Sequence, residues 1–91
     1  MISLSTHVLD TGAGRPAEGV RVELVGVGDA TTDADGRARL ADGLRPGEYT
    51  LVFHPPSPFF RRVELTVALE DGHYHVPLLV SPFGCASYRG S

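Results

Sequence analysis

The chain has 91 residues, a length typical of one domain, and carries a formal net charge of −3 at pH 7. Its 8 basic side chains are all arginines, are scattered along the chain and are outnumbered by 11 acidic ones, so we expect no nucleic-acid partner. The sequence has no charged and apolar leader and no apolar run of membrane-spanning length, so we expect a soluble cytoplasmic protein with no membrane partner.

A chain of this size can build only a small hydrophobic core. Folding at this length buries about 60–65% of the surface that the unfolded chain exposes. Small domains offset a limited core with disulfides, metal ions or oligomerisation. The one cysteine, Cys85, has no partner for an intrachain disulfide, which leaves a metal ion or an oligomer.

The first half of the chain predicts strands separated by turns. Apolar and polar residues alternate over residues 2–10, which predicts a strand with Ser3, Ser5 and His7 on its polar face. After the loop "TGAGRPAEG", a second strand is predicted in "GVRVELVGV". In "TDADGRARL" the pair Asp35-Gly36 favours a tight turn with positive φ, so we expect short strands at Thr31–Thr32 and Arg37–Leu40.

The second half continues in the same way. Strands are predicted in "GEYTLVFH", "RRVELTVAL" and "HYHVPLLV", and Pro77 in the last of these indicates a sheet edge or a bulge. The connector "HPPSPFF" contains three prolines close together, which excludes a helix there. Six or seven short strands with regular turns favour an all-β sandwich.

Histidines are the main candidates for chemistry. His73 and His75 are two residues apart on a predicted strand and so share a face. Because imidazole titrates near ~6.5, such a pair can divide acid and base roles near neutral pH. A solvated histidine at the end of a strand is the alternative for His73. Taken in isolation, His7 and Arg37 are ordinary surface residues.

A zinc site and a cysteine nucleophile are two further candidate chemistries. His7, His73 and His75 are compatible with a catalytic zinc site of three imidazoles and an open fourth position, although their spacing is not diagnostic. Cys85 has neither a neighbouring base nor a basic residue beside it in "FGCAS", so we expect a packed side chain and not a nucleophile.

Three blocks of the sequence resemble the transthyretin-related 5-hydroxyisourate hydrolases. They are "LSTHVLDTGAGRPAEGVRVEL" near the start, "TDADGR" in the middle, and "HYHVPLLVSPFG" running into "YRGS" at the end. In that family "YRGS" separates the hydrolases from transthyretin, the hormone carrier with the same fold. The resemblance implies one domain over residues 1–91, an all-β, transthyretin-like (prealbumin-like) β-sandwich of about seven or eight short strands. The family's short helix is expected to be absent, because "PPSPFF" stands in its place.

The resemblance also implies a reaction, a site and an assembly. The reaction is hydrolysis of 5-hydroxyisourate to 2-oxo-4-hydroxy-4-carboxy-5-ureidoimidazoline in urate catabolism, without a metal or an organic cofactor. The implied catalytic residues are His7, Arg37 and His75, and the substrate-binding residues are His73, Tyr88, Arg89, Gly90 and Ser91. Family members are homotetramers, dimers of dimers whose pockets lie between subunits, which agrees with the small core.

Three other functions are compatible with the sequence, and the sequence differs from the family at two further places. A non-catalytic, small-molecule-binding sandwich of the transthyretin kind, a structural module of the carboxypeptidase-regulatory kind and a zinc hydrolase are the alternatives. The segment between "VELVG" and "DATTD" is shorter than is usual in the family, and Cys85 stands where a tyrosine is common. Retention of "YRGS" together with the histidines favours the hydrolase.

Overall fold

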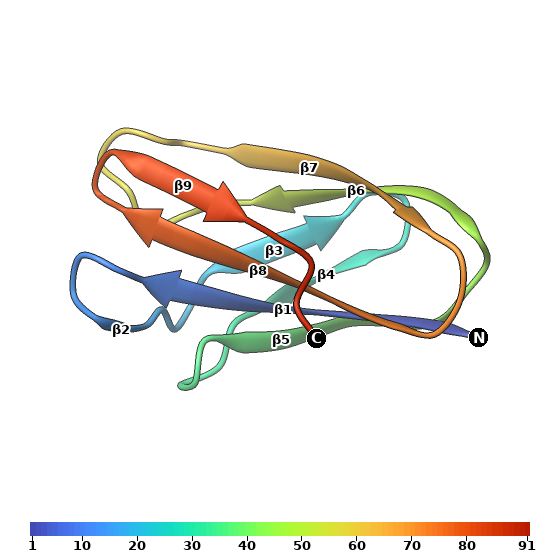
Figure 1. The fold of residues 1–91 in the computed structure, drawn as a ribbon. Helices are drawn as coiled ribbons and strands as arrows, with labels where there is room; N and C mark the ends of the chain where they lie inside the picture. Colours follow the sequence, from blue (N-terminus) through green and yellow to red (C-terminus); the bar gives the residue numbers. More distant parts are fainter.

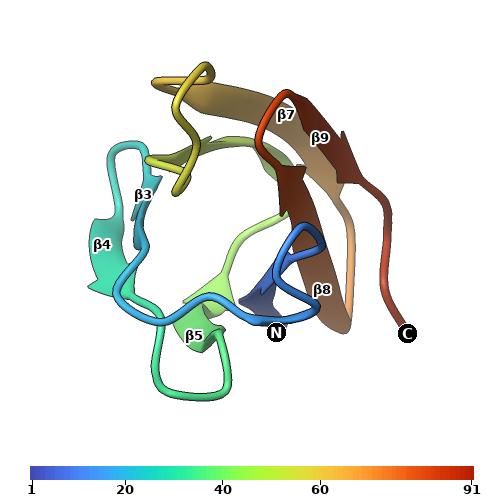
Figure 2. The same ribbon diagram turned by 90° about the vertical axis from the view of Figure 1, so that its left-hand side faces the viewer.

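The computed structural model describes residues Met1 to Ser91 and contains nine β-strands and no helix. The strands form two sheets that face each other around one apolar core (Figure 1, Figure 2). The expectation of an all-β sandwich without the family's helix is confirmed. No helix is therefore present that is long and apolar enough to cross a membrane.

The first sheet is centred on β1. Its strands are β1 (Ile2–Asp10), β2 (Arg15–Pro16), β5 (Arg37–Leu44), β8 (His73–Ser81) and β9 (Gly84–Ser87). Along one side β1 pairs with β5 and then with β2, both antiparallel, and along the other side it runs parallel to β8. The outer strand β9 pairs antiparallel with β8.

The second sheet is antiparallel throughout, in the order β4, β3, β6, β7. Its strands are β3 (Arg21–Leu24), β4 (Gly28–Thr31), β6 (Gly47–Phe53) and β7 (Val63–Leu69). Two boundaries differ from the expectation, since β5 continues to Leu44 and Thr32 lies outside β4. Thr32 is buried, and its hydroxyl accepts a hydrogen bond from the Val20 amide and donates one to the Ala17 carbonyl, so this residue joins two loop segments instead of extending a strand.

The core follows the alternation of the strands. On β1, every second side chain from Ile2 to Val8 is at most 1% exposed, and the three apolar ones pack with apolar residues of β3, β6 and β8. Thr6 is the polar member of this face, and its hydroxyl donates to the Val76 carbonyl at 2.6 Å. The intervening residues of β1 therefore face outward, where they form the outer face of the first sheet.

The turn at Asp35-Gly36 links the two sheets and lies against β1. Gly36 has φ +76°, as predicted, and a β carbon at this position would lie 2.5 Å from the Val8 carbonyl oxygen. The Asp33 carboxylate accepts hydrogen bonds from the amides of Asp35 and Arg37. Glycine is required here both by the backbone conformation and by the close approach, and the turn delivers Arg37 beside β1.

The prediction that Pro77 marks a sheet edge or a bulge is wrong. β8 is an interior strand, and its parallel register with β1 runs without interruption from His73 to Val80. The His75 carbonyl points toward the β9 side, so the main chain of Pro77 does too, because residues i and i+2 face the same way. Pairing with β9 ends at Leu78, and the missing amide hydrogen of Pro77 therefore leaves no gap in a ladder.

The connector "HPPSPFF" is irregular, as expected. Ser57 organises it, because its hydroxyl donates to the Pro82 carbonyl and accepts hydrogen bonds from the amides of Phe59 and Phe60. Its contact with Pro82 ties the connector to the turn between β8 and β9.

Candidate functional site

Three of the four histidines lie together on the outer face of the first sheet. The parallel register of β1 and β8 sets Ser3 beside His73 and Ser5 beside His75, while the antiparallel register of β1 and β5 sets His7 beside Arg37. The ring centroids of His7 and His75 are 6.2 Å apart. Strand pairing therefore brings together the three residues that the sequence indicated as catalytic.

These side chains line a concave surface with a volume of about 840 Å³. Only 3 of the 15 residues around it are hydrophobic, so it suits a polar ligand better than an apolar one. The lining residues are Ser5, Thr6, His7, Ala30, Thr31, Asp33, Arg37, Ala38, Arg39, His73, His75, Pro77, Tyr88, Gly90 and Ser91.

His7 has a defined tautomer. Its Nε2 lies 2.8 Å from the Asp35 carbonyl oxygen, which can only accept a hydrogen bond. Nε2 of His7 therefore carries a hydrogen, and in the neutral ring Nδ1 is the nitrogen with a free lone pair. The same turn that positions Arg37 thus also orients the His7 ring.

His75 is held in its neutral form. Burial lowers the pKa of His75 below its usual value of 6.5, and electrostatic interactions with His7, Arg37 and His73 lower it further. Nδ1 of His75 lies 2.8 Å from the Ser5 hydroxyl, and no protein group bonds to Nε2. A neutral imidazole with one nitrogen free is suited to act as a general base.

His73 is exposed, and both of its ring nitrogens are engaged. Nδ1 lies 2.6 Å from the Ser3 hydroxyl, and Nε2 lies 3.1 Å from the Ser5 hydroxyl. Ser5 is therefore within hydrogen-bond distance of two histidines at once. The expectation that His73 contacts substrate stays a prediction.

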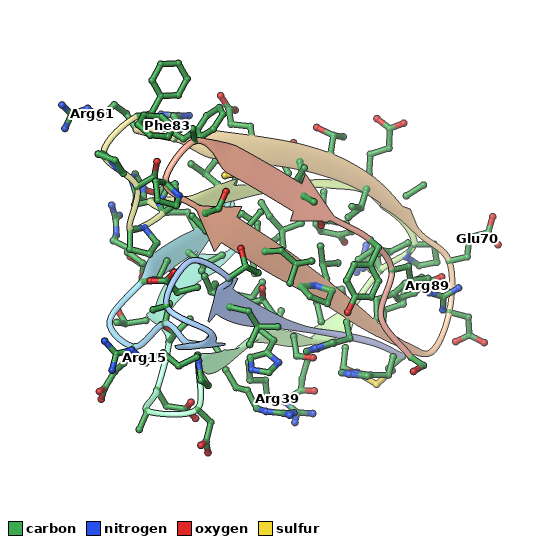
Figure 3. The ribbon with its side chains drawn as sticks, turned by 60° about the vertical axis from the view of Figure 1, so that its left-hand side comes forward. Arg15, Arg39, Arg61, Glu70, Phe83 and Arg89 are labelled. Carbon is green, nitrogen blue, oxygen red and sulfur yellow. The ribbon has the colours of Figure 1, made fainter.

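The two arginines of β5 on this face differ in their partners. Arg39 forms a bidentate ion pair with Asp42, with both nitrogen–oxygen distances at 3.0 Å, and lies below the sheet in Figure 3. The Arg37 guanidinium has no carboxylate partner, although its main-chain amide is bonded to Asp33. Arg37 is therefore the arginine whose donors are available to a ligand.

The last four residues cross back over β8, as the red end of the ribbon shows in Figure 1. The Gly90 amide donates to the His75 carbonyl at 2.7 Å, and Tyr88, Gly90 and Ser91 line the concave surface. Arg89 does not line it, because its guanidinium lies 4.3 Å from the centre of the Tyr74 ring. Figure 3 shows Arg89 at the end of the sandwich that carries Glu70. The segment is thus anchored on one side by Arg89 and faces the concave surface with its other residues.

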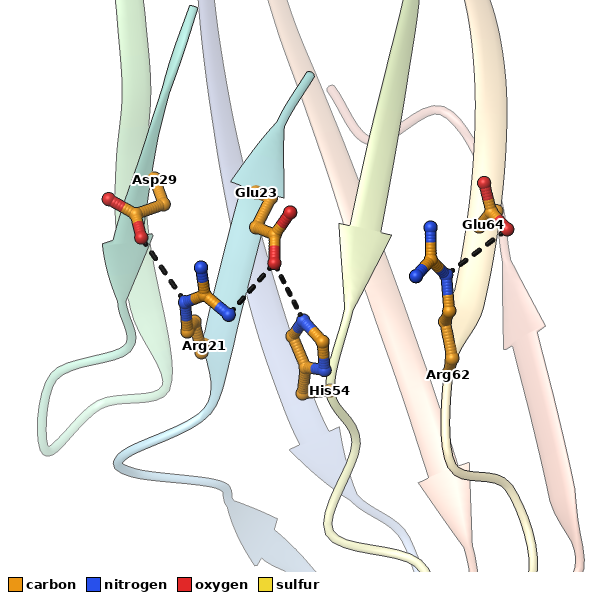
Figure 4. A network of polar contacts seen from close by, with 6 residues as sticks. All are labelled: Arg21, Glu23, Asp29, His54, Arg62 and Glu64. Carbon is orange, nitrogen blue, oxygen red and sulfur yellow. Dashed lines mark hydrogen bonds and ion pairs between the residues drawn. The ribbon is translucent and has the colours of Figure 1, made fainter. Parts of the chain in front are cut away.

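The fourth histidine belongs to a separate network on the second sheet (Figure 4). His54 bonds to Glu23 at 2.9 Å, and Glu23 also pairs with Arg21 at 2.8 Å. The hydrogen bond from His54 lowers the pKa of the Glu23 carboxyl, with a smaller contribution from Arg21. His54 therefore has a local structural role away from the concave surface.

The other two candidates from the sequence were a zinc site and Cys85. No three side chains of the histidine, cysteine, aspartate and glutamate types are grouped so that they could share a metal ion. Cys85 is a free, partly buried cysteine that packs against the core, and burial raises the pKa of its thiol.

Sequence reasoning did not identify Ser5 as a site residue. Alternation on β1 placed Ser5 on the same face as His7, but its position beside His73 and His75 depends on the parallel pairing of strands about 70 residues apart. The carbonyl of Asp35, which fixes the His7 tautomer, was missed for a similar reason, because the turn contacts β1 only in the folded chain.

Comparison with known proteins agrees with the fold and with this arrangement of residues. A sequence model described as the HIUase/Transthyretin family matches residues 4–90. A 5-hydroxyisourate hydrolase from Rhizobium meliloti (strain 1021) is 41% identical over 114 aligned positions, covering 97% of this chain and 95% of the relative. The aligned length exceeds the 91 residues of this chain, so the relative has residues that this chain lacks, as expected for shortened loops.

Solved structures show the same relationship. The 5-hydroxyisourate hydrolase of Klebsiella pneumoniae superimposes with a TM-score of 0.89 and 36% identity, covering 100% of both chains. Sea bream transthyretin in complex with thyroxine superimposes with a TM-score of 0.82 over 96% of this chain and 93% of that one. Its identity of 24% establishes a common fold and nothing further.

Proposed function

The chain belongs to the HIUase/Transthyretin family, and we propose that its hydrolytic site is the cluster of His7, Arg37 and His75 on the outer face of the first sheet. The chain is an enzyme that hydrolyses 5-hydroxyisourate, a step of urate degradation. The observation that supports the site most strongly is the convergence of these three side chains, from β1, β5 and β8, on one polar concave surface.

His75 is the proposed general base. Its partly buried ring is neutral near pH 7, and Nε2 is free to take a proton from a water molecule as the water oxygen attacks a ring carbonyl carbon. His7 stands beside it with Nδ1 as a free acceptor, and its proposed role is to orient the attacking water. His75 then returns this proton to the nitrogen of the substrate ring as the bond between that nitrogen and the attacked carbon breaks.

Arg37 is proposed to bind the substrate and to stabilise the oxyanion that forms on its carbonyl oxygen. Attack on the carbonyl places negative charge on its oxygen, and donors directed at that oxygen stabilise the transition state more than the ground state. The Arg37 guanidinium has no competing carboxylate, and its planar fork can contact two acceptors of a flat, polar substrate. Tyr88, Gly90 and Ser91 are proposed to close the substrate side of the surface, while Arg89 acts through its contact with Tyr74.

Alanine substitution tests these assignments. Replacing His7, Arg37 or His75 is expected to lower kcat by a factor on the order of 10² or more, the usual scale for loss of a base or an oxyanion donor. His54→Ala is the matched histidine control, because the one side-chain hydrogen bond of His54 is with Glu23 of the second sheet. Rates near the native value for all three site variants, with the same preparation of substrate, would remove the assignment.

We also propose that the chain forms a homotetramer, a dimer of dimers whose concave surfaces lie between subunits, and that it works in the cytoplasm. The concave surface is open on the isolated chain, and a second, mainly apolar groove lies between β7 and the segment that includes Tyr88 and Arg89. Both features fit surfaces that a second copy covers, and the single free thiol of Cys85 fits a reducing compartment. Light scattering that gives the mass of a monomer at micromolar concentration would contradict the assembly.

A further inference from the structure

Ser3, His73, Ser5 and His75 form one continuous line of hydrogen-bonding groups across β1 and β8. The three successive distances are 2.6 Å, 3.1 Å and 2.8 Å, and each falls between a serine hydroxyl and a ring nitrogen. His73 contacts one serine through each of its ring nitrogens. His75 contacts Ser5 through Nδ1, and its Nε2 is free. Each serine hydroxyl can donate one hydrogen bond and accept another, so a proton can pass along the whole line.

We propose that Ser5 and His73 form a proton relay behind His75, which moves the positive charge that His75 acquires during hydrolysis onto the exposed ring of His73. The proposal rests on the hydrolytic role of His75 given above. It makes Ser5 and His73 positioning residues that act through His75, with no requirement that either one contacts the substrate.

Two orientations of the hydrogens keep every contact in the line with Ser5 donating to one of the histidines, and they match two states of the base. In the first, His75 Nδ1–H donates to Ser5, Ser5 donates to His73 Nε2, and His73 Nδ1–H donates to Ser3. Nε2 of His75 then has a free lone pair and can accept a proton from water. In the second, His73 Nε2–H donates to Ser5 and Ser5 donates to His75 Nδ1, while the charged His73 ring still donates from Nδ1 to Ser3. Nε2 of His75 then carries a hydrogen that it can donate.

The transfer conserves protons and involves no redox change. His75 Nε2 gains a proton from water while the water oxygen bonds to the substrate carbon and the carbonyl electron pair moves onto oxygen. The Nδ1–H bond of His75 then breaks in favour of Ser5, and the former hydroxyl proton of Ser5 passes to Nε2 of His73. Reversal of these shifts lets His75 Nε2 protonate the ring nitrogen as the carbon–nitrogen bond breaks.

The surroundings of the two histidines favour this direction of transfer. His75 is partly buried and lies next to His7 and Arg37, so a positive charge on its ring is opposed by desolvation and by like charges. His73 is exposed to solvent, which stabilises a charged ring. The relay therefore lowers the free energy of the state in which the water has been deprotonated.

The relay can be tested with native protein, His75→Ala and four further single variants. Ser5→Ala interrupts the line, Ser5→Thr keeps a hydroxyl at the same place, and His73→Ala removes the final acceptor. Ser81→Ala is the matched serine control, because it lies at the far end of β8 and its hydroxyl contacts only the Gly84 carbonyl. Each variant is assayed with 5-hydroxyisourate generated in situ from urate, with and without added imidazole, after subtraction of the enzyme-free rate.

Loss of a relay changes kcat more than KM. Ser5→Ala and His73→Ala are expected to lower kcat by about 10-fold or more, part of the range for acid–base catalysis, with KM within about two-fold of native. Ser5→Thr and Ser81→Ala are expected to stay near native. Because truncation of the exposed His73 leaves an open position, imidazole should restore kcat of His73→Ala and have no effect on native protein.

The outcomes separate this proposal from the proposed function. If native protein hydrolyses the substrate and His75→Ala does not, but Ser5→Ala and His73→Ala have native kcat, the relay is absent and the base assignment stands. If both variants are slow but imidazole restores neither and Ser5→Thr is as slow as Ser5→Ala, their effect is structural and the relay is likewise rejected. If native protein does not accelerate the reaction, the proposed function itself fails.

Discussion

Gly90→Ala probes the contact that joins the C-terminal segment to the proposed base. A β carbon at position 90 would lie 2.7 Å from Cδ2 of His75 and 3.2 Å from its carbonyl oxygen. The φ angle of Gly90 is outside the left-handed region, so alanine adds no backbone strain and acts only through this contact. Carbon atoms in contact lie about 3.5–4.0 Å apart, so the His75 ring or the segment must shift by roughly 0.8 Å or more.

A shift of this size matters more for the rate than for stability. Misplacing a catalytic group by about 1 Å can cost about 10²-fold, so we expect Gly90→Ala to lower kcat by about 10- to 100-fold. If the segment detaches, the hydrogen bond from the Gly90 amide to the His75 carbonyl is lost, which costs only about 0.5–1.5 kcal/mol of unfolding free energy. Initial rates of 5-hydroxyisourate loss and urea unfolding of the same samples measure the two effects.

Gly28→Ala is the matched control. A β carbon at Gly28 meets no atom within 4 Å, and its φ angle is not positive, so both rate and stability should stay near native. A native kcat for Gly90→Ala would show that the contact with His75 does not constrain the base, and equal losses in both variants would show a general effect of adding a methyl group.

Three further predictions concern other parts of the molecule. Deletion of Arg89–Ser91 should abolish most hydrolysis but lower the unfolding free energy by only about 1–2 kcal/mol, because one hydrogen bond and one cation–π contact are lost. Full activity of a truncated, folded protein would refute this. The acidic limb of kcat/KM should have its midpoint below pH 6.5, because burial and like charges lower the pKa of His75 and the base works in its neutral form; a pH profile with its midpoint at or above 6.5 would contradict the assignment. Thr32→Val should lower the unfolding free energy by about 2 kcal/mol or more, since it leaves buried main-chain groups of Val20 and Ala17 without partners, and a midpoint of urea unfolding unchanged from native would argue against that bridge.

Features that depend on neighbouring residues could be predicted from the sequence. Alternation identified the outward face of β1 with His7, and the Asp35-Gly36 pair identified a turn that needs positive φ. The prolines of "HPPSPFF" likewise excluded a helix, because proline restricts its own backbone and that of the preceding residue.

Features that depend on which strands pair could not be predicted in the same way. The expectation for Pro77 was wrong because β8 is an interior strand. The sequence does not show that pairing with β9 ends at Leu78, one residue away, so that proline can be accommodated there. The contacts of Ser5 with two histidines likewise follow from the parallel register of β1 and β8.

The C-terminal segment shows that the residues of a family motif need not all have the same role. The resemblance implied that all four residues of "YRGS" belong to the pocket. In the structure, Gly90 bonds to His75 while Arg89 turns away to the Tyr74 ring. Beyond Ser87 the segment leaves the regular strand, so alternation no longer predicts which side chains face the sheet.

The most direct test of the central claim is the rate at which freshly generated 5-hydroxyisourate loses its ultraviolet absorbance in the presence of the protein. The substrate decays on its own, so the quantity to measure is the initial rate above the protein-free rate as a function of protein concentration. We predict an added rate that is proportional to native protein, is retained by His54→Ala and falls by a factor on the order of 10² or more in His75→Ala. A native protein that adds nothing to the spontaneous rate, or a His75→Ala variant as fast as native, would contradict the account.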